Sequence, residues 1–260
     1  MYLAVDIGGT KTLIALFSSR GRVLKRVKFK TSRVKSKFMN DLARNLQPFS
    51  RRKVRSVVVA VPGTVQKNCS VLLGNRLEWG QIDLHTPIKN LFSCPISFEN
   101  DASLAALYEG SFYKGRVVFL TFSTGIGGGV SENRKILPES ASFEPGHTIY
   151  EYAGKKAEWE DIAAASALEK YYHVDVATDL RRKEIMQDVA ARVSLGLPDV
   201  ISAQKPDVIV LGGPFGKIFK RYVKYLPDLD VRYVRPKRPL ESVIYGCYLY
   251  AKQIERENKK

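Results

Sequence analysis

The chain has 260 residues and a mass of 29.2 kDa, which suits one large domain or two domains of ordinary size. Hydrophobic residues make up 45% and charged residues 26%, a globular composition that excludes a disordered or collagen-like chain. No apolar run approaches the ~20 residues of a membrane span, and we expect no signal peptide at Met1. The three cysteines, Cys69, Cys94 and Cys247, are far apart, so we expect a cytoplasmic protein without a membrane partner.

The net charge of +16 predicts a surface that attracts phosphates, whether in nucleotides, nucleic acid or lipid headgroups. The excess is uneven, because residues 20–37 hold nine basic side chains and no acidic one. This run is either a solvated face or a nucleic-acid groove. The solvated face is favoured, since only Phe29 and Phe38 could stack on bases, and we expect no specific nucleic-acid partner.

Hydrophobic patterns predict an α/β order in the first half of the chain. Strands are expected at Tyr2–Ile7, Thr12–Phe17, Val23–Lys30, Val57–Val61 and Pro95–Phe98, and helices at Phe38–Leu46, Ile82–Phe92 and Asp101–Tyr108. Short turns join the first three strands, which predicts an antiparallel meander. Pro48 is expected to end the first helix.

The second half repeats the order of strand, glycine turn and strand. Strands are expected at Val117–Phe122, Gly129–Glu132, Asp207–Leu211 and Val231–Val234, a glycine turn at Gly125–Gly129, and helices at Asp161–Tyr172, Lys183–Gln204, Phe215–Tyr225 and Leu240–Ile254. The stretch from Pro138 to Ala157 has no clear period, and long irregular stretches are usually functional. The repetition predicts a duplicated α/β domain with a cleft between two lobes.

The first motif that suits phosphate chemistry is Asp6-Ile7-Gly8-Gly9-Thr10-Lys11. Glycines let backbone N–H groups approach an anion closely, and the Lys11 ammonium can reach phosphate oxygens. Asp6 can hold a hydrated magnesium ion, which prefers one or two carboxylates plus waters. An ordinary hairpin turn is an equally good interpretation of these residues taken alone.

Three further motifs carry polar groups that could serve a reaction. The run Thr124-Gly125-Ile126-Gly127-Gly128-Gly129 could cradle further phosphates. Asp101, in Glu99-Asn100-Asp101, could take a proton from a substrate hydroxyl or could simply cap the helix that follows. Glu144 and His147, three residues apart in the irregular stretch, could grip hydroxyl groups, although a lone histidine is more often structural.

Taken in order, these motifs resemble those of the ROK family of sugar kinases and repressors, from Tyr2 to about Ala251. Val61-Pro62-Gly63, Asn75 with Trp79, and Val208–Gly213 resemble further family motifs. The resemblance implies a duplicated actin-like ATPase (RNase H-like) fold. Its lobes would be residues 1–112 and 113–260, with the last helix, about 240–254, packing back on the first lobe.

The resemblance also implies an ATP-dependent sugar kinase, acting on a 6-hydroxyl as a homodimer. Asp101 would be the catalytic base, and the sugar would be bound by Asn75, Asn100, Asp101, Glu144, His147 and Glu160. Asp6 would hold Mg²⁺ through water, and ATP would be bound by Asp6, Gly8, Gly9, Thr10, Lys11, Thr124, Gly125, Gly127, Gly128, Gly212 and Gly213. Glucose, fructose, allose, N-acetylmannosamine and N-acetylglucosamine all remain open as the substrate.

Two departures from the family pattern bear on function. The family's zinc-binding cysteines are replaced by Glu151, Ala153 and Glu158, so we expect no zinc site. We expect the loop to be ordered by packing of Tyr150, Tyr152 and Trp159, with Lys155 and Lys156 balancing the charges of Glu151 and Glu158. Only five residues precede Asp6, so we expect no DNA-reading module. The alternative function is a non-catalytic, sugar-responsive regulator that acts through a protein or nucleic-acid partner.

Overall fold

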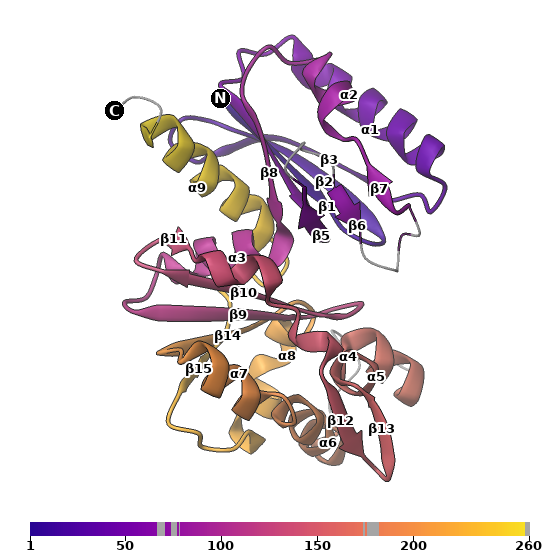
Figure 1. Ribbon diagram of the computed structural model, residues 1–260, viewed down its shortest axis with the longest axis vertical. Coiled ribbons are helices and arrows are strands. Elements are labelled where there is room, and N and C mark those ends of the chain that lie inside the picture. The colour runs from indigo at the N-terminus through magenta and orange to yellow at the C-terminus, as the bar shows by residue number, and fades with distance from the viewer. Residues whose placement is uncertain (67–70, 74–76, 78, 174, 176–181, 258–260) are drawn as a thin grey trace. The chain divides into compact units, whose positions relative to one another are not determined.

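A computed structural model of the chain describes residues 1–66, 71–73, 77, 79–173, 175 and 182–257 (Figure 1). By its internal contacts the chain divides into two compact units, unit 1 (Met1–Ala105 and Val243–Lys260) and unit 2 (Ala106–Ser242). The division falls within helix α3 (Asp101–Gly110), and the sequence-based boundary at 112/113 lies just beyond the end of that helix.

Unit 1 is built on a five-stranded sheet in the order β3-β2-β1-β4-β8. Its strands are β1 (Tyr2–Ile7), β2 (Lys11–Phe17), β3 (Val23–Lys30), β4 (Ser56–Val61) and β8 (Ile96–Asn100). β2 is antiparallel to β1 and β3, which confirms the predicted meander, whereas β4 runs parallel to β1 and β8. A smaller sheet contains β5 (Gly63–Val65), β6 (Val71–Leu73) and β7 (Gln81–Ile82).

Helices cover both faces of the unit 1 sheet (Figure 1). They are α1 (Lys35–Ser50) and α2 (His85–Lys89) on one face and α9 (Ser242–Glu257) on the other. Successive side chains of a strand point to opposite faces. Accordingly, Leu3 and Val5 belong to the core that includes α1, while Tyr2 packs edge-on against Tyr248 of α9.

The sheet of unit 2 repeats this strand pattern, in the order β11-β10-β9-β14-β15. Its strands are β9 (Arg116–Phe122), β10 (Ile126–Glu132), β11 (Lys135–Ile136), β14 (Val208–Gly212) and β15 (Arg232–Val234). β10 is antiparallel to β9 and β11, and β14 is parallel to β9 and β15. Two sheets with the same order and the same strand directions confirm the predicted duplication.

In the described part of unit 2, five helices cover one face of the sheet (Figure 1). They are α4 (Trp159–Ala163), α5 (Ala165–Tyr172), α6 (Lys183–Ser194), α7 (Leu197–Gln204) and α8 (Phe215–Tyr222), the last followed by a 3₁₀ turn, η3 (Val223–Tyr225). Their buried side chains share one core with β9, β10 and β14, centred on Phe122, Trp159 and Phe215. Two 3₁₀ turns, η1 (Pro138–Ser142) and η2 (Pro145–His147), precede a hairpin of β12 (Ile149–Tyr152) and β13 (Lys155–Glu158).

Several predicted boundaries are wrong. Pro48 lies inside α1 rather than ending it, and Phe49, fully buried, anchors the last turn to the core. Between residues 82 and 92 only α2 is helical. The expected helix 161–172 breaks at the extended Ala164, and the expected helix 183–204 breaks before α7, whose first turn contains a proline.

The glycine run in unit 2 also differs from its prediction. β10 begins at Ile126, so Gly127–Gly129 lie in a strand and not in a turn. A Cβ atom on Gly128 would lie 2.3 Å from the Phe143 ring. The absence of a side chain at this position therefore lets the segment before η2 pack closely on β10.

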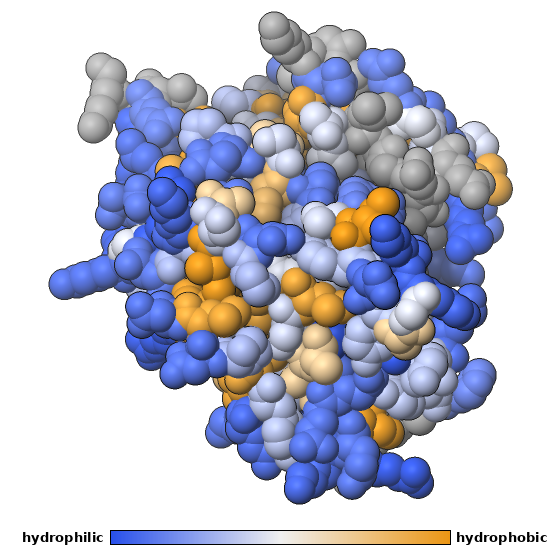
Figure 2. All heavy atoms as spheres, turned by 60° about the horizontal axis from the view of Figure 1, so that its bottom comes forward, coloured by the Kyte–Doolittle hydropathy of each residue, from blue (hydrophilic) through white to orange (hydrophobic). Residues whose placement is uncertain are grey.

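No helix among the described residues is both long and apolar enough to cross a membrane. On the face shown in Figure 2 hydrophilic residues predominate, with smaller hydrophobic areas between them. The most exposed large hydrophobic side chains of unit 2, among the residues that the structure describes, are Phe112, Ile149, Tyr171 and Leu240.

Candidate active site

Unit 1 brings Asp6, Lys11 and Asp101 within electrostatic reach of one another. Asp6 lies on β1, between Leu13 of β2 and Ala60 of β4 in register. The residue is partly exposed, but its carboxylate is desolvated. Burial, and then the negative charge of Asp101, raise the pKa of Asp6 to about 7, while Lys11 opposes the shift. A buried carboxylate that is costly to ionise is a group whose charge a bound cation would stabilise.

The turn after β1 is tight. The Gly8 N–H donates to the Lys11 carbonyl over 3.1 Å, and a Cβ atom on Gly8 would lie 3.0 Å from that oxygen. The Thr10 carbonyl accepts a hydrogen bond from the Thr31 N–H over 3.0 Å, which ties the turn to the segment after β3. The turn that sequence analysis assigned to phosphate binding is thus fixed at both ends by backbone contacts.

The Glu99-Asn100-Asp101 run joins the end of β8 to the start of α3. The Asn100 side-chain oxygen accepts from the Ser103 N–H over 3.1 Å, which is the hydrogen bond of a helix N-cap. The alternative interpretation gave this capping role to Asp101, and the structure gives it to Asn100. Asp101 is instead the first residue of α3, and its Oδ1 accepts from the adjacent Ala102 N–H.

Asn75 lies outside the described residues, whereas Trp79 is described and buried. Its indole nitrogen donates to the Arg33 carbonyl over 2.7 Å, and its ring packs against Phe38 at 4.3 Å between centroids. Trp79 therefore belongs to the core of unit 1.

In unit 2 the turn between β9 and β10 is closed by Ser166. The Ser166 hydroxyl donates to the Thr124 carbonyl over 2.8 Å, and its N–H donates to the Ser123 carbonyl over 3.1 Å. Packing and backbone conformation explain the glycine pair at the end of β14. A Cβ atom on Gly212 would lie 2.3 Å from the Phe119 ring, and Gly213 has φ +66°, which favours glycine. Glycine at these positions lets the end of β14 pair closely with the end of β9, next to the turn between β9 and β10.

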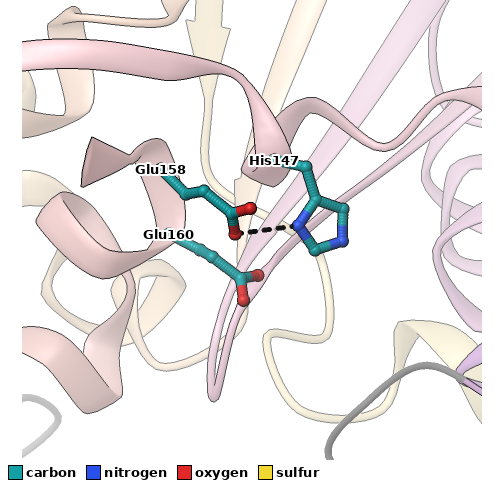
Figure 3. Close-up of side chains that lie close together, drawn as sticks. All are labelled: His147, Glu158 and Glu160. Atoms are coloured by element: carbon teal, nitrogen blue, oxygen red, sulfur yellow. Dashed lines mark hydrogen bonds and ion pairs between the residues drawn. The ribbon is translucent and has the colours of Figure 1, made fainter. Parts of the chain in front are cut away.

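His147 of the irregular stretch lies close to Glu158 and Glu160, which follow that stretch in unit 2 (Figure 3). His147 Nδ1 and a Glu158 carboxylate oxygen are 3.0 Å apart, and Glu160 accepts from the Ile126 N–H over 3.2 Å. Hydrogen bonding to Glu158 raises the pKa of His147, and burial raises the pKa of Glu144. Residue 146 must be glycine here, because a Cβ atom at this position would lie 2.3 Å from the Ile126 carbonyl oxygen.

The same residues are the metal-donor group among the described part of the chain. One donor atom each from His147, Glu158 and Glu160 lie within 4.8 Å of one another. A closed structural zinc site needs four ligands, mostly thiolates, and this set offers one nitrogen and two oxygens. The donor set therefore does not fit the zinc site that the family resemblance implies.

The contacts of Ser166, Glu158, Asp188 and Arg192 were not predicted from the sequence, and the last two form a 2.6 Å ion pair on α6. Glu158 was expected only to replace a cysteine and to pair with a lysine, and nothing local marked Ser166. Asp188 and Arg192 carry a weak signal, an acid–base pair four residues apart on a helix, but that spacing is common on exposed faces.

Comparison with known proteins identifies the family of the chain. The family model described as ROK family matches residues 2–241. The chain belongs to the ROK family. A ROK glucokinase from Streptomyces griseus, solved in complex with glucose and AMPPNP, superimposes with a TM-score of 0.79 at 21% identity, covering 97% of this chain and 99% of that one. This likeness shows the actin-like ATPase fold shared by ROK sugar kinases.

ROK relatives of both functional kinds match the sequence. The xylose repressor of Bacillus spizizenii is 26% identical over 178 residues, covering 59% of this chain and 46% of the repressor. The N-acetylmannosamine kinase of Yersinia pestis is 26% identical over 240 residues, covering 82% of this chain and 83% of the kinase. The chain spans about half the length of the xylose repressors that it matches first.

Proposed function

We propose that this ROK protein is an ATP-dependent sugar kinase that phosphorylates a hydroxyl, the 6-hydroxyl, of a hexose or N-acetylhexosamine in the cytoplasm. The observation that carries the proposal is the proximity of Asp6, Lys11 and Asp101 in unit 1. A regulator that only senses sugar has no need of a costly pair of neighbouring carboxylates beside an ammonium group.

Each residue has a role in the proposed reaction. Asp101 accepts the proton of the attacking hydroxyl, and Lys11 binds phosphate oxygens. Asp6 would hold Mg²⁺ through water, and the bound ion supplies charge neutralisation for the phosphates. The sugar hydroxyls would be held by Asn75, Asn100, Glu144, His147 and Glu160.

Each unit would supply groups that bind ATP. Gly8, Gly9 and Thr10 of unit 1 would offer backbone N–H groups to the phosphates, as would the residues of the second turn, Thr124, Gly125, Gly127 and Gly128. Gly212 and Gly213 would lie beside the adenosine. We further propose a homodimer, as the ROK resemblance implies.

A coupled ATPase assay over a panel of hexoses and N-acetylhexosamines tests the proposal. We expect ADP release that depends on one sugar of the panel, and calorimetry should show that this sugar binds. Binding of a sugar without any turnover would contradict the kinase and support the alternative of a non-catalytic regulator.

A further inference from the structure

The hairpin β12–β13 presents Glu158 and leads directly into Trp159 and Glu160, so its position sets the geometry of the proposed sugar-binding residues. Its two strands pair from Ile149 opposite Glu158 to Tyr152 opposite Lys155. A two-stranded hairpin alone is only marginally stable in water. Contacts from outside the hairpin must therefore hold it in place.

One buried side chain, Arg192 of α6, contacts three segments of this region. Its guanidinium carbon lies 4.7 Å from the Tyr152 ring centroid on β12 and 4.6 Å from that of Tyr171 on α5. Its Nη1 donates to the Ile162 carbonyl on α4 over 3.1 Å. The Arg192 backbone carbonyl also accepts from the Trp159 indole nitrogen over 3.0 Å.

Asp188, one turn earlier on α6, completes the arrangement. Its carboxylate accepts from Arg192 Nε over 2.6 Å and from the hydroxyl groups of Tyr152 and Tyr172. Burial disfavours the charge on Asp188, but the hydrogen bonds from the two tyrosines and Arg192 outweigh it and lower its pKa. The carboxylate thus joins β12, α5 and α6 through three donors.

Trp159 transmits this arrangement to the proposed site. Its side chain is fully buried, and its backbone N–H donates to the carbonyl of Thr148, the residue after His147, over 2.8 Å. Its sequence neighbours are Glu158, which bonds to His147, and Glu160, which accepts from Ile126. Fixing Trp159 therefore fixes the residues on each side of it.

We propose that Asp188 and Arg192 are positioning residues that take the place of a structural metal in holding His147, Glu158 and Glu160. The unsuitable donor set for zinc and the contacts of α6 with the hairpin support the same conclusion. The inference rests on the proposed function only where it takes His147 and Glu160 to bind sugar.

Hydrogen exchange of the metal-free, full-length protein tests the inference without using activity. Asp188→Asn and Arg192→Lys should each speed exchange of the amides in residues 149–158 by about tenfold or more, because hydrogen bonds to charged groups are the strong ones. Tyr152→Phe, which keeps the ring and loses one donor, should have a smaller effect. Amides of β9 and β14 should change little, which separates loosening of the hairpin from unfolding of the unit.

Arg182→Lys and Glu184→Gln, at exposed positions at the start of α6, are the matched controls and should leave exchange unchanged. In the kinase assay, Arg192→Lys should raise KM for sugar about tenfold and leave KM for ATP within about twofold. Unchanged exchange of the hairpin in both Asp188→Asn and Arg192→Lys would overturn the inference.

The second part of the test measures hydrogen exchange of the hairpin with and without zinc. The wild-type hairpin should show the same protection in chelator and in added zinc, and protection that appears only with zinc would also overturn the inference. A protected hairpin in a wild-type protein that phosphorylates no sugar would contradict the proposed function alone, and the exchange of the variants would still decide the role of Asp188 and Arg192.

Discussion

The two units share a strand order but differ in charge and chemistry. Unit 1 has 22 lysines and arginines against 8 acidic residues, and unit 2 has 20 against 18. The turn after β1 lies beside Asp6 and Lys11, whereas the matching turn after β9 offers the hydroxyls of Ser123 and Thr124. Backbone pairing and buried side chains hold each sheet, so the polar residues at its turns are free to diverge after duplication.

The largest expected effect is on catalysis in unit 1. Asp101→Asn should lower kcat by about 10²–10⁴-fold while sugar binding persists, because the amide cannot accept the hydroxyl proton. Steady-state kinetics with calorimetric sugar binding measure both quantities. Asp41→Asn, which removes an acid paired with the exposed Arg44 of the same unit, is the control and should behave as wild type. Turnover of Asp101→Asn within threefold of wild type would exclude it as the base.

Trp159→Ala tests the part of unit 2 next to the proposed sugar residues. The ring is fully buried, and a Cβ on Gly196 would lie 2.5 Å from it, so the cavity should cost about 3–5 kcal/mol of unfolding free energy. KM for sugar should rise more than KM for ATP. Phe49→Ala, an equally buried change in unit 1, should lose comparable stability without that selective rise. Equal rises in both constants for Trp159→Ala would contradict the assignment.

Asp6→Asn should lower kinase activity, because Asp6 is proposed to hold Mg²⁺, and should raise the free energy of unfolding. The folded pKa of about 7 is above the ordinary value of 3.8, so the stability present below pH 3.8 is lost as pH rises through 7. An uncharged amide avoids this loss, and the free energy of unfolding should rise by up to about 4 kcal/mol at pH 8. Denaturant unfolding at pH 8 and pH 5 measures the gain, which should shrink at pH 5. A gain of equal size at both pH values would show that the carboxylate charge is not its cause.

The smallest effect concerns the tip of the hairpin. Ala153 has φ +51° and Gly154 has φ +75°, the left-handed pair of a two-residue hairpin turn that favours Asn-Gly. Ala153→Asn should therefore stabilise unit 2 by about 0.5–1 kcal/mol, and Ala153→Val should destabilise it. Thermal unfolding of the two variants compares them, and the same melting temperature for both would contradict the turn geometry.

Much of each sheet could be predicted from the sequence. Val57–Val61 and Val117–Phe122 are buried strands within runs of apolar residues, and glycines mark the ends of β1 and β14. The repeated order of strand, glycine turn and strand indicated the duplication, and the order of the motifs indicated the family. These features are local in the chain, so pattern and spacing are sufficient to find them.

The contacts that organise the proposed sugar site could not be predicted in the same way. Tyr152 meets Asp188 and Arg192 only after α6 packs against the hairpin, and no local pattern records that meeting. Sequence analysis expected Lys155 and Lys156 to balance Glu151 and Glu158. In the structure Glu158 bonds to His147 instead, because the strand register places it opposite Ile149.

A hairpin held by tyrosines, an arginine and a carboxylate responds differently to oxidants than one held by thiolate ligands. Residues 106–242 contain no cysteine, and their one methionine, Met186, is buried in the core. Peroxide attacks sulfur most readily where it is a thiolate or is exposed. Unit 2 therefore offers peroxide no accessible sulfur, and oxidative stress that strips zinc from thiolate sites should leave its proposed sugar-binding residues in place.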